Sequence, residues 1–207
     1  MRLPESDTHF QECAERGYYH QRKTMMFAWS FLNNWRAAVD VGAHCGFMTR
    51  DMGRFFNVVY AFEPEPENYR CLFENTLGVP VAAYNVALGA FEGEMGMLQP
   101  APTNSGAWEP CSIRDAQIKV PMRTLDSYGL ENVDFLKIDV QGGEMAVLEG
   151  AEDTLRRCEP VIMVEVPKTV RHKLMKQSFD CDTLQFLMEL GAKPQGYANS
   201  DVVLAWL

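Results

Sequence analysis

An acidic side chain precedes a glycine-rich turn in the first quarter of the chain. Asp40 lies in the short apolar run Ala37–Val41, and the turn that follows contains Gly42 and Gly46. Glycines at such a turn let the backbone approach a ligand and adopt positive φ. The dinucleotide fingerprint GxGxxG spaces its glycines differently, and a pyrophosphate would avoid a carboxylate so close to it. The pattern therefore favours a ligand with an ammonium group and sugar hydroxyls over a nicotinamide dinucleotide.

A second carboxylate stands where the next apolar run ends. Glu63 follows residues 58–62 and precedes Pro64. Because open α/β sheets bind ligands at the carboxyl ends of their strands, Glu63 is in a position to accept both hydroxyls of a ribose. The alternative is that Asp40 and Gly42 only form a tight turn and that Glu63 only caps a helix. The two acids in this order favour the ligand site.

The densest polar cluster covers residues 134–144. Lys137 interrupts an apolar strand, Asp139 stands at the carboxyl end of that strand, and Glu144 begins the next helix. Acids and an amide around one strand end suit either a substrate hydroxyl or the amine of a cofactor. An ordinary capped helix with an ion pair at Lys137 competes with this interpretation for Lys137 and Glu144. For Asp139 we favour the ligand site.

Apolar runs alternate with segments of helical periodicity, which predicts an α/β fold whose mostly parallel sheet is covered on both faces. Strands are expected at residues 37–41, 58–62, 81–88, 133–140 and 161–166. Helices are expected at residues 47–56, from Pro66 onward with Tyr69, Leu72 and Phe73 on the inner face, at 144–158 and at 183–190. Short β pieces are expected at residues 94–98 and 118–122, and an antiparallel C-terminal hairpin at 195–197 and 202–206. The three- and four-residue spacing of apolar side chains over residues 7–35 predicts one or two amphipathic helices.

The bulk composition limits what the protein can bind. With a formal net charge of −9, the chain lacks the basic balance that binding to nucleic-acid phosphates requires. The six cysteines form no CxxC pair, which indicates free thiols in a reducing compartment rather than a zinc site or a disulfide scaffold. The sequence contains neither a signal-peptide core nor an apolar stretch long enough for a membrane helix. We expect a cytoplasmic protein with no nucleic-acid and no membrane partner.

The ordered set of motifs resembles the FkbM family of methyltransferases. The matching segments are VDVGAHCG (39–46), YAFEPEP (60–66), NVALG (85–89), TLD (124–126), LKIDVQGGE (136–144) and VLEGA (147–151), followed by Glu165. The resemblance implies the Rossmann-like, doubly wound sheet of class I methyltransferases, with S-adenosyl-L-methionine as cofactor. It also implies O-methylation in most cases, often of a sugar hydroxyl. His44 stands where asparagine is usual in the family.

The resemblance assigns the cofactor-binding residues in three groups. Asp40, Gly42 and Gly46 would hold the methionine part, Glu63 the ribose, and residues 85–87 the adenine edge. The full expected set is Asp40, Gly42, Ala43, His44, Gly46, Phe47, Glu63, Pro64, Asn85, Val86, Ala87 and Asp139.

Asp139 and His44 are the candidate catalytic groups that would deprotonate an acceptor hydroxyl. Since aspartate is a weak base, either an apolar shell should raise the pKa of Asp139 or Asp139 should act together with His44. The alternatives are that Asp139 only holds the cofactor amine and that His44 is only a turn residue. Asp139 and Glu165 are too few carboxylates for a magnesium site, so no metal is expected.

The combined prediction is an S-adenosylmethionine-dependent O-methyltransferase with a small-molecule or carbohydrate acceptor. A helical extension (1–35) would precede the methyltransferase domain (36–207). The alternatives are a catalytically degenerate cofactor- or ligand-binding domain, and a methyltransferase acting on another small molecule or on nucleic acid. Trp108 and residues 104–106 lie in a long central loop of the kind that often carries function. For His172, a solvated basic face is favoured over a substrate-covering loop.

Overall fold

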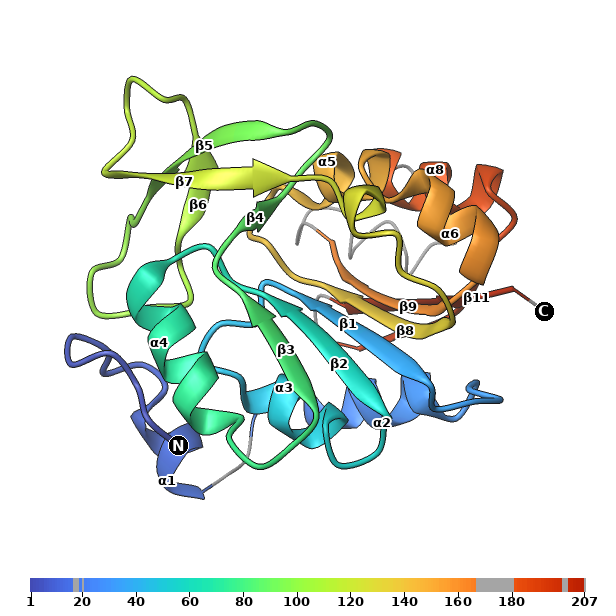
Figure 1. Ribbon diagram of the computed structural model, residues 1–207, viewed down its shortest axis with the longest axis horizontal. Coiled ribbons are helices and arrows are strands. Elements are labelled where there is room, and N and C mark those ends of the chain that lie inside the picture. Colours follow the sequence, from blue (N-terminus) through green and yellow to red (C-terminus); the bar gives the residue numbers. More distant parts are fainter. Residues whose placement is uncertain (17–18, 20, 167–180, 199–200, 207) are drawn as a thin grey trace.

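A seven-stranded sheet forms the centre of the protein (Figure 1). The computed structural model describes residues 1–16, 19, 21–166, 181–198 and 201–206. The strands, in spatial order, are β10 (Lys193–Ala198), β11 (Asp201–Ala205), β9 (Val161–Glu165), β8 (Val133–Ile138), β1 (Ala37–Val41), β2 (Val58–Phe62) and β3 (Val81–Tyr84). Neighbouring strands from β9 to β3 are parallel, whereas β11 is antiparallel to both β9 and β10. The predicted α/β class, the mostly parallel sheet and the antiparallel C-terminal hairpin are confirmed.

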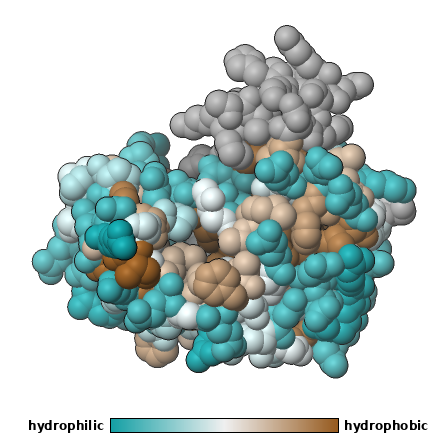
Figure 2. Space-filling view, turned by 90° about the horizontal axis from the view of Figure 1, so that it is seen from above, coloured by the Kyte–Doolittle hydropathy of each residue, from teal (hydrophilic) through white to brown (hydrophobic). Residues whose placement is uncertain are grey.

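Helices cover both faces of this sheet. They are α1 (Gln11–Arg16), α2 (Arg22–Trp29), α3 (Phe47–Met52), α4 (Pro66–Asn75), α5 (Glu144–Glu149), α6 (Glu152–Cys158) and α8 (Asp182–Glu189), with a 3₁₀ turn η1 (Asp126–Tyr128). Ala38 and Phe135 pack on one face with Met25 of α2 and Met52 of α3, while Leu136 belongs to the core on the other face. Because neighbouring residues of a strand point to opposite faces, the continuous apolar strands are buried on both sides. Hydrophilic side chains cover much of the surface, and apolar ones gather in the middle of the face seen from above (Figure 2).

The expectation of one strand at residues 81–88 is wrong, because the segment divides between two sheets. β3 ends at Tyr84, and the chain leaves the main sheet at Asn85, whose side-chain amide donates to the carbonyls of Glu63 and Pro64, each at 2.9 Å. The second sheet has the order β4-β7-β5-β6 and consists of β4 (Ala87–Leu88), β5 (Gly93–Leu98), β6 (Glu109–Cys111) and β7 (Ile118–Arg123). The two short β pieces expected at residues 94–98 and 118–122 pair with each other in this sheet.

The expected helix at residues 144–158 is interrupted. The break lies at Gly150, where an added Cβ would be 2.0 Å from the carbonyl oxygen of Gly89. This close approach joins the start of the second sheet to the corner between α5 and α6. Phe73 is not on the inner face of α4: it is 54% exposed, because Leu72 takes the buried position.

The N-terminal segment forms two short helices, as expected. Met25 and Ala28 of α2 are buried in the core beneath the main sheet. Residues that precede β1 therefore pack directly on the α/β layer. His172 lies outside the described residues. In the part of the chain that the structure describes, no helix has the length and apolar character needed to cross a membrane.

Candidate cofactor and acceptor site

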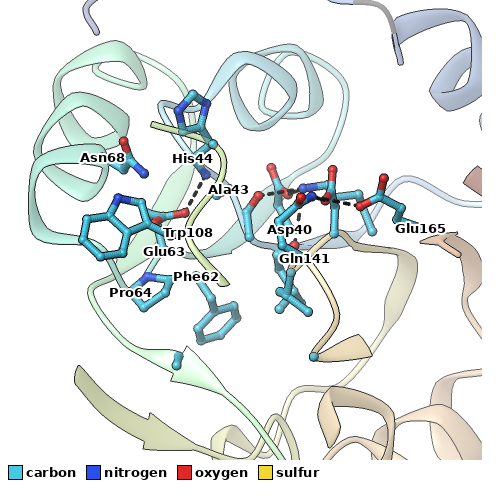
Figure 3. A pocket seen from close by; sticks show the side chains of 18 of the residues that line it. Asp40, Ala43, His44, Phe62, Glu63, Pro64, Asn68, Trp108, Gln141 and Glu165 are labelled. Carbon is cyan, nitrogen blue, oxygen red and sulfur yellow. Dashed lines mark hydrogen bonds and ion pairs between the residues drawn. The ribbon is translucent and has the colours of Figure 1, made fainter. Parts of the chain in front are cut away.

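A cavity of about 240 Å³ lies at the carboxyl ends of β1, β2 and β8 (Figure 3). The expected cofactor residues that line it are Asp40, Gly42, Ala43, His44, Phe47, Glu63, Pro64, Val86, Ala87 and Asp139. Gly46 and Asn85 are not among the lining residues. Gly46 is the N-cap residue of α3, and Asn85 holds the turn that follows Glu63.

Glu63 lies at the end of β2 and is 5% exposed. Its carboxylate accepts hydrogen bonds from the backbone N–H groups of His44 at 2.8 Å and Glu65 at 3.0 Å. Burial raises the pKa of Glu63 to about 7, because it outweighs the opposing effect of these hydrogen bonds. The carboxylate is thus fixed in orientation at the cavity wall, and each oxygen keeps lone-pair capacity for a hydroxyl donor.

Two glycines of the turn are required by packing. Gly42 has a φ of +75°, and an added Cβ would lie 1.9 Å from the carbonyl oxygen of Asp139. Gly46 has a φ of +81°, and its Cβ would lie 2.8 Å from Cδ1 of Leu72 in α4. A side chain at Gly42 would displace the backbone at Asp139, whereas one at Gly46 would move the end of the Leu72 side chain and strain a backbone of positive φ. Gly42 brings the tip of β8 against the turn and so shapes the cavity floor.

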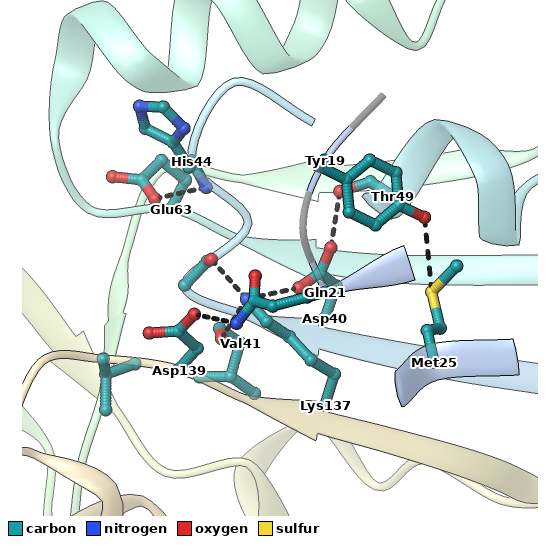
Figure 4. Close-up of polar contacts among 12 residues, drawn as sticks. Tyr19, Gln21, Met25, Asp40, Val41, His44, Thr49, Glu63, Lys137 and Asp139 are labelled. Atoms are coloured by element: carbon teal, nitrogen blue, oxygen red, sulfur yellow. Dashed lines mark hydrogen bonds and ion pairs between the residues drawn. The ribbon is translucent and has the colours of Figure 1, made fainter. Parts of the chain in front are cut away.

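Asp40 forms an ion pair with Lys137. An ion pair at Lys137 is the alternative to a ligand-binding role that the sequence left open for this lysine. Lys137 Nζ lies 3.1 Å from Asp40 Oδ1, and Thr49 Oγ1 donates to Asp40 Oδ2 at 2.6 Å (Figure 4). Lys137 also donates to the carbonyl of Gly42 at 2.7 Å. Burial disfavours the charge on Lys137, but the negative charges of Asp40 and Asp139 outweigh burial and hold the pKa of Lys137 above its usual value. The pair therefore neutralises its own charges and braces the turn.

Asp139 sits between two amide side chains. Gln21 Nε2 donates to Asp139 Oδ2 at 3.0 Å, and Gln141 Nε2 donates to Oδ1 at 2.8 Å and to Glu165 Oε2 at 2.9 Å. Burial opposes ionisation of Asp139, but the charge of Lys137 and the hydrogen bonds outweigh it and hold the pKa below its usual value. Of the two expectations for Asp139, a raised pKa and joint action with His44, the raised pKa is therefore wrong. Asp139 is an ionised hydrogen-bond acceptor at neutral pH.

The sequence profile of the methyltransferase FkbM domain matches residues 40–193. The chain belongs to the FkbM methyltransferase domain family. The match begins at Asp40, so the helices α1 and α2 precede the part that the family shares. No curated protein sequence matches the chain at a significant level.

Solved structures with the class I methyltransferase fold resemble this FkbM domain. An FkbM methyltransferase from Methylobacillus flagellatus KT has a TM-score of 0.53 and 16% identity, over 84% of this chain and 44% of that one. A putative methyltransferase from Streptococcus mutans, solved in complex with SAH, has a TM-score of 0.54 and 14% identity, over 92% and 99% of the two chains. A ribosomal protein L11 methylase from Lactobacillus delbrueckii subsp. bulgaricus has a TM-score of 0.53 and 13% identity, over 90% and 78%. This chain spans less than half the length of the Methylobacillus protein.

The N-terminal segment that precedes the FkbM domain contributes to the cavity, which the sequence did not indicate. Phe10, Tyr19 and Gln21 line it. Besides Asp139, Gln21 Nε2 contacts Asp201 Oδ1 at 3.3 Å. These contacts join residues that are far apart in the sequence, and no local spacing or composition marks Gln21 for this role.

The second sheet and its loops form the opposite wall. Met95 and Met97 of β5, with Trp108 before β6, line the cavity. Residues 104–106 line it as well, so the central loop singled out in the sequence does reach the site. Within the described residues, no group of three or more histidine, cysteine, aspartate or glutamate side chains is arranged to hold a metal ion.

Proposed function

We propose that this FkbM domain is an S-adenosylmethionine-dependent methyltransferase that methylates a hydroxyl of a sugar or a glycosylated metabolite. The observation that carries the proposal is one cavity whose lining includes the carboxylates of Glu63 and Asp139, from the ends of β2 and β8 on either side of β1. Family membership supports methyl transfer. The likeness to a structure in complex with SAH supports the same cofactor here.

The chemistry of the lining fits this cofactor. Glu63 would take the ribose hydroxyls, the apolar Val86 and Ala87 would face the adenine, and the turn that begins at Gly42 would hold the methionine end. Lys137 is already paired with Asp40 and offers no charge to a pyrophosphate. When bound, the cofactor supplies a methyl group that its positive sulfur has made electrophilic.

The protein's own part in the reaction is to align the acceptor and to accept its proton. A positioned base contributes typically ~10²–10⁴-fold to such a step. Because the pKa of Asp139 is low, Asp139 first orients the substrate hydroxyl by accepting a hydrogen bond from it. Asp139 takes the proton late, once the new bond to the methyl group has made the hydroxyl acidic. The imidazole of His44 contacts Ser105, and its backbone N–H donates to Glu63. We therefore assign His44 to the cofactor rather than to proton removal.

Calorimetry tests the cofactor assignment. The protein should bind S-adenosylmethionine and its demethylated product, S-adenosylhomocysteine, and should not bind NAD. At pH 8, where Glu63 is mostly ionised, Glu63→Ala should weaken binding by about 1.5–3 kcal/mol, the range for hydrogen bonds to a charged group. The exposed Glu67→Ala is the matched control and should bind as the wild type does. Undiminished affinity in Glu63→Ala would refute the ribose assignment.

A screen with a labelled methyl donor tests the acceptor class. Glycans and glycosylated metabolites should be labelled, and nucleic acids should not. Exclusive labelling of nucleic acid would overturn the proposal. Tight cofactor binding without transfer to any acceptor would instead support a degenerate binding domain.

The six cysteines are all free, which fits the reducing cytoplasm that we propose as the location.

A further inference from the structure

Three polar side chains from distant parts of the chain form a hydrogen-bonded row beside the cavity. His44 Nε2 lies 2.6 Å from Ser105 Oγ, and Ser105 Oγ donates to the Asp7 carboxylate. The backbone N–H of Ser105 donates to the same Asp7 oxygen at 2.9 Å, and the N–H of Phe10 donates to the other oxygen at 2.8 Å. Asp7 is 2% exposed and Ser105 is 3% exposed. The row thus joins the N-terminal segment, the central loop and the turn after β1.

The row determines which nitrogen of the imidazole carries the proton. Burial opposes ionisation of Asp7, but the hydrogen bonds from Phe10 and Ser105 outweigh it and hold the pKa below its usual value. An ionised carboxylate only accepts, so the single hydroxyl proton of Ser105 is directed at Asp7. Ser105 Oγ must then accept its hydrogen bond from His44. His44 therefore carries its proton on Nε2 and keeps a lone pair on Nδ1.

The imidazole is also fixed in place and uncharged. The ring of Phe10 packs against it with a centroid distance of 4.7 Å, and the ring of Phe47 lies at 6.4 Å. Burial lowers the pKa of His44 to about 4, so the ring is neutral at physiological pH. Among the described residues, Nδ1 has no hydrogen-bond partner, and His44 lines the cavity.

We propose that Asp7 and Ser105 are positioning residues of the cofactor site, which hold His44 in the Nε2–H form so that Nδ1 accepts a hydrogen bond from a ribose hydroxyl. The ribose is the partner because the backbone N–H of His44 is bonded to Glu63, the carboxylate assigned to that sugar. The inference rests on the proposed function and extends its site to Asp7, which lies outside the family match.

The tautomer is tested without cofactor by long-range ¹H–¹⁵N spectra of histidine-labelled protein, with His44→Gln used to assign the His44 signals. The wild type should show a protonated Nε2 and an unprotonated Nδ1. Ser105→Ala removes the acceptor and should increase the Nδ1–H form. Ser105→Thr keeps the hydroxyl and should retain the wild-type pattern. A wild-type His44 protonated on Nδ1 would overturn the inference even if neither variant folds.

Binding of S-adenosylhomocysteine and 5′-methylthioadenosine tests the ribose contact, because the second ligand lacks the amino-acid end. Ser105→Ala should weaken both by the same factor, about 3- to 10-fold for one neutral hydrogen bond, and Ser105→Thr should weaken neither. Unchanged affinity in Ser105→Ala, or a loss confined to S-adenosylhomocysteine, refutes the inference alone. Failure of the wild type to bind either ligand refutes the proposed function and the ribose contact together.

Discussion

Replacing Asp201 by asparagine should stabilise the folded chain, by an amount that grows with pH. Asp201 is the first residue of β11 and is 1% exposed. Its Oδ1 accepts from Gln21, while Oδ2 has no hydrogen-bond partner among the described residues. Burial, with the charge of Asp139 nearby, raises the pKa of Asp201 from 3.8 to about 7. Asparagine has the same shape, keeps an oxygen for Gln21 and cannot ionise.

The sign of the effect follows from the raised pKa. The folded state holds the Asp201 proton more tightly than the unfolded chain does, so the contribution of Asp201 to stability is complete below pH 3.8 and is lost as pH rises through 7. At 1.36 kcal/mol per pKa unit, the loss is about 2 kcal/mol at pH 5 and about 4 kcal/mol at pH 8. The advantage of Asp201→Asn should therefore grow by about 2–3 kcal/mol between these two pH values.

Urea denaturation of the wild type and Asp201→Asn at intervals from pH 5 to pH 8 measures this difference. The exposed Glu131→Gln makes the same acid-to-amide change without burial, and its difference from the wild type should stay flat. A pH-independent difference for Asp201→Asn, or an advantage that shrinks as pH rises, would refute the reasoning. Either result would mean that Asp201 is ionised in the folded state at little free-energy cost.

Two further variants test the turn and the strand-end carboxylate. Gly42→Ala should lower the thermal midpoint strongly or prevent folding, because its Cβ would lie 1.9 Å from the Asp139 carbonyl oxygen. Gly78→Ala is the control, since Gly78 has a similar φ of +86° but open space around it. Equal losses in the two variants would show that backbone strain alone is responsible. Asp139→Asn should lower turnover by about 10²-fold or more while cofactor affinity stays near that of the wild type. Collapsed affinity with normal turnover at saturation would instead make Asp139 a cofactor-binding residue.

The sequence located the central strands and the carboxylate at the end of β2 correctly. β1 and β2 have the bounds that the sequence predicts, because each is a short run, apolar apart from Asp40, that is closed by glycine or by Glu63-Pro64. Such runs are buried on both faces of a parallel sheet, so their ends fix the edge where ligands bind. Local chemistry therefore suffices to bring Glu63 and Asp139 to one cavity.

Two breaks, at Asn85 and at Gly150, were not visible in the sequence. The run 81–88 contains no glycine or proline, yet it divides at Asn85, because the side chain of Asn85 donates to the carbonyls of Glu63 and Pro64 after β2. The break at Gly150 similarly reflects the close approach of Gly89 from another layer. Both depend on contacts between segments that periodicity treats separately.

What the sequence determined by itself is the α/β order, the strand ends and the types of polar side chain that gather there. Only the tertiary structure decided how those side chains are paired and charged. It brought Gln21 to Asp139, Asp7 to Ser105 and Lys137 to Asp40, and it set the pKa of Asp139 low, where the sequence allows either a raised pKa or joint action with His44. The reason is physical: residue type and spacing fix which groups reach an edge, while burial and hydrogen-bond partners, which set a group's charge, come from segments far away in the chain.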